Sequence, residues 1–153
     1  MFTCTKTYEN LPCAHRQWRH EGNCALIHGY SRAFKFHFGA EQRDKCGFIV
    51  DFGDLGWLKD YLEYNFDHTL LIQKDDPHLA LFEALPMVGA GALRLVESTS
   101  TEGMAEMVWM FADSELRKRT KGRCWVIAVE CLENNKNSAV FHNLEAGFKG
   151  WTE

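Results

Sequence analysis

The segment from Cys13 to Tyr30, CAHRQWRHEGNCALIHGY, gathers side chains that bind metals or transfer protons. His15 comes first, and three residues separate Cys24 from His28. Imidazole nitrogens and thiolate sulfur are the usual ligands of divalent transition metals, and a thiol also serves as a nucleophile or base. The segment therefore predicts a metal site with an acid–base group beside it.

His15 and His28 are the best candidates for metal ligands, because each lies where an expected strand meets a loop. The third ligand stays open. Tyr30 shares the strand face of His28 by the two-residue period, His20 could reach the site from the loop, and water is the third alternative. His37 is excluded, because nine residues of extended strand place it about 30 Å from His28.

The bulk properties predict one compact domain over residues 1–153. A chain of 153 residues with 46% hydrophobic side chains can bury a substantial core. A net charge of −4 argues against nucleic-acid and anionic-membrane partners. The basic run from Arg117 to Arg123 is the exception. It could hold a polyphosphate, but a solvated helix end is the favoured interpretation.

The six cysteines contain no Cys-x-x-Cys pair. No signal peptide and no apolar membrane-spanning stretch is recognisable, so we expect reduced thiols in a cytoplasmic protein. Cys4, Cys46, Cys124 and Cys131 lie in strand-like runs, where a buried inert thiol is expected. Cys24 differs, because its neighbours are histidines.

Local patterns predict an α+β domain with helices on one face of a four-stranded antiparallel sheet. Alternating or apolar runs predict strands over residues 2–8, 26–38, 46–52 and 124–132, the first ending in a turn at residues 10–12. Capping residues and apolar stripes predict helices from Asp51 or Asp54 to Tyr64, from Asp76 to Leu85 and from Ser100 to Lys118. A turn at residues 134–137 should precede a short C-terminal helix.

Partial motifs in a consistent order resemble the 6-pyruvoyl/6-carboxytetrahydropterin synthase family. Beyond the first segment, residues 49–55 resemble its strand-to-helix signature, and Asp67-His68 resembles its Leu-Asp-His-x-x-Leu motif. Residues 100–105 resemble Thr-x-Glu-Asn-x-Ala, and residues 126–131 resemble the final Val-x-Val-x-Glu-Thr strand. The chain departs from the family at Tyr30, where a histidine is usual, and at Gly103, where asparagine is usual.

The resemblance implies a role for each matching residue. His15 and His28 would bind zinc, and Cys24, Asp67 and His68 would form the proton-transfer set. Glu130 would accept hydrogen bonds from the pterin ring, because a carboxylate suits the ring's 2-amino and N3 donors. Thr101 and Glu102 would also contact the substrate. Without the resemblance, Asp67-His68 reads as a helix terminus and Ser100-Thr101-Glu102 as an ordinary helix start.

The resemblance also implies the tunnelling fold, in a single pterin synthase-like domain that assembles as a hexamer with active sites shared between subunits. The spacing of Cys24 and His28 is most similar to bacterial 6-carboxytetrahydropterin synthases. These convert 7,8-dihydroneopterin triphosphate to 6-carboxy-5,6,7,8-tetrahydropterin with release of acetaldehyde and triphosphate, toward 7-deazaguanine nucleosides such as queuosine. One alternative is 6-pyruvoyltetrahydropterin formation or dihydroneopterin side-chain cleavage. Another, of a different class, is a non-catalytic pterin- or purine-binding protein of the same fold.

Overall fold

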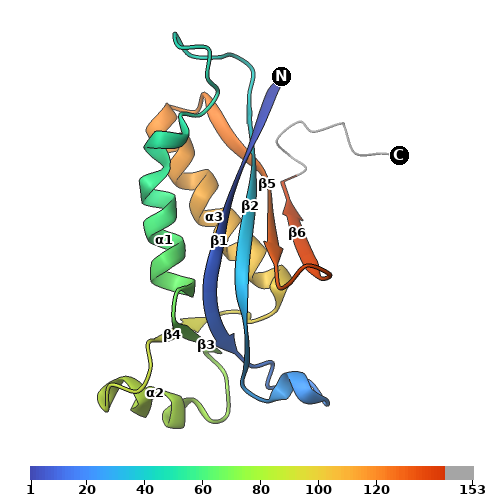
Figure 1. The fold of residues 1–153 in the computed structure, drawn as a ribbon, viewed down its shortest axis with the longest axis vertical. Coiled ribbons are helices and arrows are strands. Elements are labelled where there is room, and N and C mark those ends of the chain that lie inside the picture. The colour runs from blue at the N-terminus through green and yellow to red at the C-terminus, as the bar shows by residue number, and fades with distance from the viewer. Residues whose placement is uncertain (144–153) are drawn as a thin grey trace.

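The computed structural model describes residues 1–143, which form one six-stranded sheet with three α-helices (Figure 1). The strands are β1 (Phe2–His15), β2 (His28–Ala40), β3 (Thr69–Gln73), β4 (Leu93–Val96), β5 (Cys124–Leu132) and β6 (Ser138–His142). The helices are α1 (Gly56–Phe66), α2 (Leu79–Met87) and α3 (Thr101–Thr120), with short 3₁₀ turns η1 (Asn23–Ala25) and η2 (Phe52–Leu55).

The sheet is mixed, so the predicted four-stranded antiparallel sheet is wrong. Its order is β4-β3-β1-β2-β5-β6. The pairs β1–β2, β2–β5 and β5–β6 are antiparallel, whereas β1–β3 and β3–β4 are parallel. The sequence pattern missed β3 and β4 because both are short. All five residues of β3 are buried, so it lacks the alternation that reveals a half-exposed strand.

The predicted strand over residues 46–52 does not form. Asp44 accepts hydrogen bonds from the backbone N–H groups of Cys46 and Phe48, at 2.8 and 2.9 Å, and Gly47 has a φ of +85°. A side chain that bonds its own following backbone replaces a strand ladder with a turn. Cys46 is therefore exposed rather than buried in a strand.

The bounds of other elements also differ from the prediction. β1 continues past the predicted turn at residues 10–12, because Asn10 (φ 62°) forms a bulge at which the register with β2 shifts. After the turn at residues 134–137 comes strand β6 rather than a helix. Any helix expected beyond His142 lies mostly outside the described residues. The helix α3 and the strand β5 match their predictions closely.

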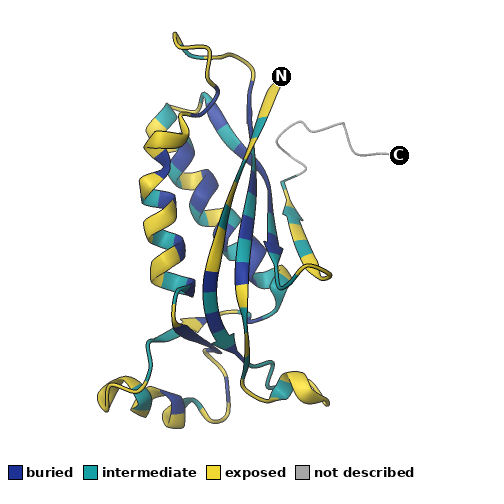
Figure 2. Ribbon diagram, viewed as in Figure 1, coloured by how far each residue is buried: buried dark blue, intermediate teal, exposed yellow. Residues whose placement is uncertain are grey.

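The core lies between the sheet and the helices α1 and α3. Phe34, Phe36 and Phe38 project from one face of β2 and are fully buried with residues of both helices. Figure 2 shows that the helix surfaces turned toward the sheet are the buried ones. Helix α2 belongs to a second small cluster with Leu70 and Ile72, whereas Leu71 belongs to the main core. Helices therefore pack on both faces of β3, which corrects the prediction of helices on one face only.

Candidate functional site

The hairpin-like pair of β1 and β2 brings the two predicted metal ligands together. His15 ends β1 and pairs with His28, the first residue of β2, so that their ring centroids lie 4.4 Å apart. The alternation of β2 continues the buried phenylalanine row through Arg32, Tyr30 and His28 on the same face. The polar site therefore begins where the hydrophobic core ends.

A cavity of about 290 Å³ opens at this point, between the ends of β1 and β2 and the start of α3. It brings together five of the predicted site residues: Cys24, His15, His28, Thr101 and Glu102. Tyr30, the open third position, also lines it. Residues from segments more than 100 positions apart thus meet in one hollow, with Glu133, Asn137 and Ser138 supplied by the β5–β6 connection.

The loop between β1 and β2 presents Cys24 and orients His28. Cys24 is exposed in η1, and its carbonyl accepts a hydrogen bond from the Gln17 N–H at 2.8 Å. His28 Nδ1 lies 2.7 Å from the Leu26 carbonyl oxygen, which can only accept, so Nδ1 carries the proton and Nε2 keeps a free lone pair. His20 does not line the cavity. Its Nδ1 instead accepts a hydrogen bond from the Gly22 N–H at 2.8 Å.

A buried arginine lies against His15. Arg32 is fully buried, and its Nη2 is 3.3 Å from His15 Nε2 and 3.5 Å from Nδ1. The pKa of His15 is lowered to about 3, chiefly by burial, then by the charge of Arg32 and by His28. His15 is therefore a neutral imidazole with a single acceptor nitrogen, and the arginine, which can only donate, lies within reach of both ring nitrogens.

Glu133 is a second carboxylate of this cavity, beside Glu102, and it was not among the predicted site residues. Its Oε2 accepts a hydrogen bond from Thr101 Oγ1 at 3.2 Å. Its hydrogen bond with Tyr30, more than any other cause, raises the pKa of the Tyr30 phenol. The signal was available, because Val129, Cys131 and Glu133 also fit the pattern Val-x-Val-x-Glu, with cysteine in place of the second valine.

Glu130, the carboxylate predicted for substrate binding, lies in a different hollow. It lines a cavity with Lys35, His37 and His142, and its Oε1 accepts a hydrogen bond from Ser138 Oγ at 2.7 Å. Glu130 lies within β5, whereas Glu133 follows Leu132, the last residue of the strand, and the two side chains line different hollows.

Asp67 and His68 do not line the cavity of their own chain. They follow α1, and His68 Nδ1 lies 2.6 Å from Asp67 Oδ1. The His68 N–H donates to the Pro12 carbonyl at 2.7 Å, and His68 has a left-handed φ of 54°. Its side chain is 83% exposed. The two side chains therefore contact each other and face solvent rather than the cavity.

The start of α3 supplies the remaining wall of the cavity. Ser100 is the N-cap and accepts a hydrogen bond from the Gly103 N–H at 3.0 Å. A Cβ at Gly103 would lie 2.4 Å from the Cβ and Oγ of Ser98. The glycine that replaces the family's asparagine is therefore required by this local packing.

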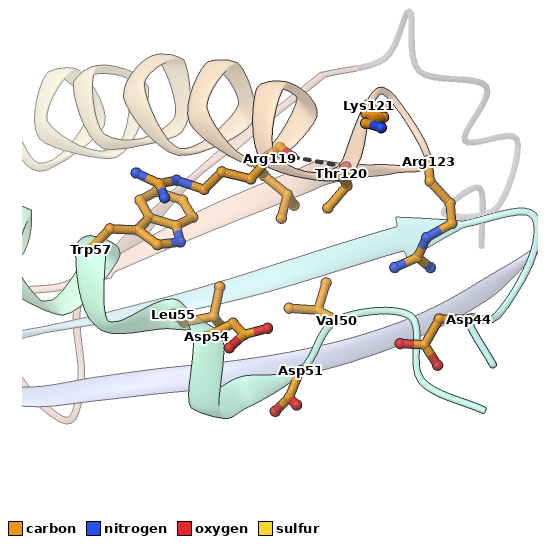
Figure 3. A pocket seen from close by; sticks show the side chains of 11 residues that line it. Asp44, Val50, Asp51, Asp54, Leu55, Trp57, Arg119, Thr120, Lys121 and Arg123 are labelled. Atoms are coloured by element: carbon orange, nitrogen blue, oxygen red, sulfur yellow. Dashed lines mark hydrogen bonds between the residues drawn. The ribbon is translucent and has the colours of Figure 1, made fainter. Parts of the chain in front are cut away.

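A second hollow, of about 650 Å³, lies at the opposite end of α3 and contains part of the basic run (Figure 3). Arg119, Lys121 and Arg123 line it, together with three aspartates: Asp44, Asp51 and Asp54. Arg123 donates to the Gln42 and Phe48 carbonyls, and Arg119 lies over the Trp57 ring. The mixture of charges does not make a polyphosphate site.

Comparison with known proteins identifies the class. The chain matches the family described as 6-pyruvoyl tetrahydropterin synthase over residues 3–143. The structure resembles an uncharacterized protein from Wolinella succinogenes, with a TM-score of 0.80 and 20% identity over 93% of this chain and 98% of that one. It also resembles 6-pyruvoyltetrahydropterin synthase from Plasmodium vivax, with a TM-score of 0.65 and 15% identity over 94% and 99%.

The chain belongs to the 6-pyruvoyl tetrahydropterin synthase family. Among curated relatives, proteins from Rickettsia conorii and Rickettsia felis named 6-carboxy-5,6,7,8-tetrahydropterin synthase are 32% and 31% identical to it over 80 residues. Those residues are 52% of this chain and 57% of each relative, so the chain spans about half the length of the curated relatives it matches. No helix within residues 1–143 is long and apolar enough to cross a membrane.

The side chains around His15 do not suit the zinc ion that the family resemblance implies. Within residues 1–143, no three His, Cys, Asp or Glu side chains converge as metal ligands. The third family position holds Tyr30, and Glu133 is the main cause that raises the pKa of its phenol, which makes the phenol a poorer metal ligand. Arg32, always charged, lies against His15, and two like unit charges 4 Å apart repel by about 4 kcal/mol at an effective dielectric constant of about 20. The repulsion doubles for a divalent ion.

Proposed function

We propose that the chain is a carbon–carbon lyase of the 6-carboxytetrahydropterin synthase type. The substrate would be 7,8-dihydroneopterin triphosphate, and the products 6-carboxy-5,6,7,8-tetrahydropterin, acetaldehyde and triphosphate, on the route to 7-deazaguanine nucleosides such as queuosine. Family membership and the names of the Rickettsia relatives support this reaction. The observation that carries the proposal is one cavity that holds a thiol, two carboxylates and two imidazoles.

Glu133 is the residue we assign to the pterin ring. A carboxylate can accept hydrogen bonds from both the 2-amino group and N3 of the ring, so it fixes the ring's orientation in the cavity. Thr101 holds this carboxylate through its hydroxyl, and Glu102 lines the same wall. Glu130 is not assigned to the ring, because it lies in the other hollow.

Cys24 is the residue we assign to proton removal from the substrate's side chain. It lies in the same cavity as His28, whose free Nε2 can accept a hydrogen bond from a side-chain hydroxyl. A thiolate acts as a base only when it reaches the reacting carbon–hydrogen bond, and an exposed loop thiol can do so.

Asp67 and His68 would return the proton in the cavity of a neighbouring subunit. Their outward position supports a homo-oligomer, such as the family's hexamer, in which each site uses two chains. A complementation assay tests this directly. Cys24→Ala and His68→Ala chains, each inactive alone, should regain activity when co-refolded, because mixed oligomers contain some sites with both wild-type residues. Absence of any recovery in verified mixed oligomers would contradict a shared site.

The proposed reaction is tested by incubating the protein with 7,8-dihydroneopterin triphosphate and identifying the products by mass spectrometry. 6-Carboxytetrahydropterin with acetaldehyde supports the proposal. 6-Pyruvoyltetrahydropterin, or the products of simple side-chain cleavage, would assign the alternative chemistry of the same family.

Tyr30 and Arg32 favour a second candidate function, a non-catalytic pterin- or purine-binding protein. Ligand binding without any turnover would assign that function.

A further inference from the structure

Arg32 is a fully buried cation behind the cavity: it does not line the cavity itself but contacts His15 and Thr101, which do. Its Nη1 lies 3.4 Å from Thr101 Oγ1 and 3.7 Å from Cys131 Sγ, and its Nη2 contacts His15. Its Nε is buried and has no hydrogen-bond partner. Among the described residues, no carboxylate lies within ion-pair distance of its guanidinium.

A buried guanidinium without a paired anion lowers the stability of the fold, so its presence here points to a functional role. A guanidinium keeps its charge even when buried, and removing it from water without a paired anion is strongly unfavourable. Hydrophobic side chains fill the next positions along the same face of β2, so an apolar residue would pack well there. The unpaired charge therefore lies where an apolar residue would fit, beside His15, which lines the cavity.

We propose that Arg32 supplies the positive charge of this cavity as a fixed side chain, and that the cavity binds its ligand without a metal ion. The proposal rests on the assignment of a dihydropterin as ligand. Arg32 is a positioning residue, because it acts through its neighbours. It donates to His15 and to Thr101, and Thr101 in turn donates to Glu133.

The chemistry that fits is a ligand with electron-rich oxygens next to a hydrogen-bond-donating ring. Glu133 faces the ring donors, whereas His28, Cys24 and the charge behind His15 surround the place left for the side chain. A neopterin carries both parts. The fixed cation favours oxygen atoms that gain negative charge, and it does so without requiring ion uptake.

Zinc titration in competition with a chromophoric chelator tests the role of Arg32 without any pterin. Wild type should bind no zinc at a stoichiometric site. Arg32→Met keeps the aliphatic stem and removes the repulsion, so its zinc affinity should rise at least about tenfold. Arg32→Lys should behave as wild type. Arg94→Met is the matched control, because Arg94 is exposed and lies over the Tyr64 ring at 4.0 Å.

Tyr30→His provides a second variant that does not disturb the buried charge. It adds a third imidazole next to His15 and His28, yet the repulsion by Arg32 should still prevent tight zinc binding. A tight zinc site in Tyr30→His, one chelator-resistant zinc per wild-type chain, or unchanged zinc affinity in folded Arg32→Met would each overturn the proposal.

Neopterin binding, followed by its fluorescence, supplies the ligand side of the test. Wild-type affinity should be the same with and without a chelator such as EDTA. Arg32→Met should bind at least about tenfold more weakly and Arg32→Lys should recover part of the loss. If binding requires added zinc, the proposal is wrong. If neopterin does not bind under any condition, the proposed function fails, whereas the zinc titration still decides whether Arg32 excludes the metal.

Discussion

Arg32 and His15 lie against each other on neighbouring strands, with Nη2 of the arginine 3.3 Å from Nε2 of the histidine. Both residues lie on the buried face of the sheet, at the point where the core meets the cavity. This contact distinguishes the site from a three-histidine metal site, because the permanent charge of Arg32 lies next to His15, an expected metal ligand. The remaining reactive groups, Cys24, His28 and Glu133, are left facing the cavity.

The substitution Cys24→Ala should abolish turnover of 7,8-dihydroneopterin triphosphate and leave the fold intact. The thiol is exposed in η1 and lines the cavity, so its loss removes the assigned base without creating a core void. Circular dichroism and product analysis on the same preparation check both parts. Cys46→Ala is the matched control, because Cys46 is also exposed but lies outside the cavity; it should keep wild-type activity. Full activity of Cys24→Ala would end the role of the thiol.

The two glutamates near the end of β5 should respond differently to the same change. Glu133→Gln should weaken neopterin binding about 30-fold, about 2 kcal/mol, because one acceptor oxygen becomes a donor that faces the ring's donors. Glu130→Gln should leave binding within about twofold, because Glu130 lies in another hollow with Lys35 and His37. Fluorescence titration of both variants measures the ratio, and the opposite order would return the ring to Glu130.

Much of the cavity could be predicted from the sequence, because its members follow local rules. His15, Cys24 and His28 lie in one short segment, so the sequence places them near one another although the predicted first strand ended at residue 8 and β1 runs to His15. The start of α3 follows from the Ser100 N-cap. What the sequence could not specify was the meeting of distant segments. In the sequence Arg32 has the pattern of an ordinary strand residue. Only the fold brings Thr101 and Cys131 next to its guanidinium.

The errors in the fold have physical causes of the same kind. β3 is buried by α2 on one face and the main core on the other, so its sequence carries no alternating pattern. The bonds from Asp44 to the following backbone remove the strand that the alternation at residues 46–52 predicts. The Glu130 assignment matched a motif but placed it three positions from the residue that reaches the cavity.

The cysteines should divide into reactive and unreactive groups in the native protein. Burial raises the pKa of Cys131 to about 12, and burial also raises the pKa of Cys13. At pH 8 both thiols stay protonated, and they gain thiolate only as the pH approaches these raised values. Iodoacetamide at pH 8, followed by peptide mass spectrometry, should label the exposed Cys24 and Cys46 and should label Cys131 only after unfolding. Rapid native labelling of Cys131 would contradict its burial.

Two glycines at the starts of helices should respond in opposite directions to alanine. At Gly103 in the first turn of α3, a Cβ would lie 2.4 Å from the Ser98 Cβ and Oγ, so the backbone beside the cavity must shift. We expect Gly103→Ala to lower the free energy of unfolding by about 1–3 kcal/mol, as overpacking does. At Gly56, the first residue of α1, a Cβ meets nothing within 4 Å and the φ of −54° is helical. Gly56→Ala should therefore raise the free energy of unfolding by about 0.5–1 kcal/mol, because alanine favours the helix.

Urea unfolding of both variants gives the comparison. Neopterin affinity should fall only in Gly103→Ala, because α3 begins at the cavity through Thr101, whereas Gly56 lies outside it. Equal stabilities of the two variants would show that the start of α3 is not constrained by Ser98.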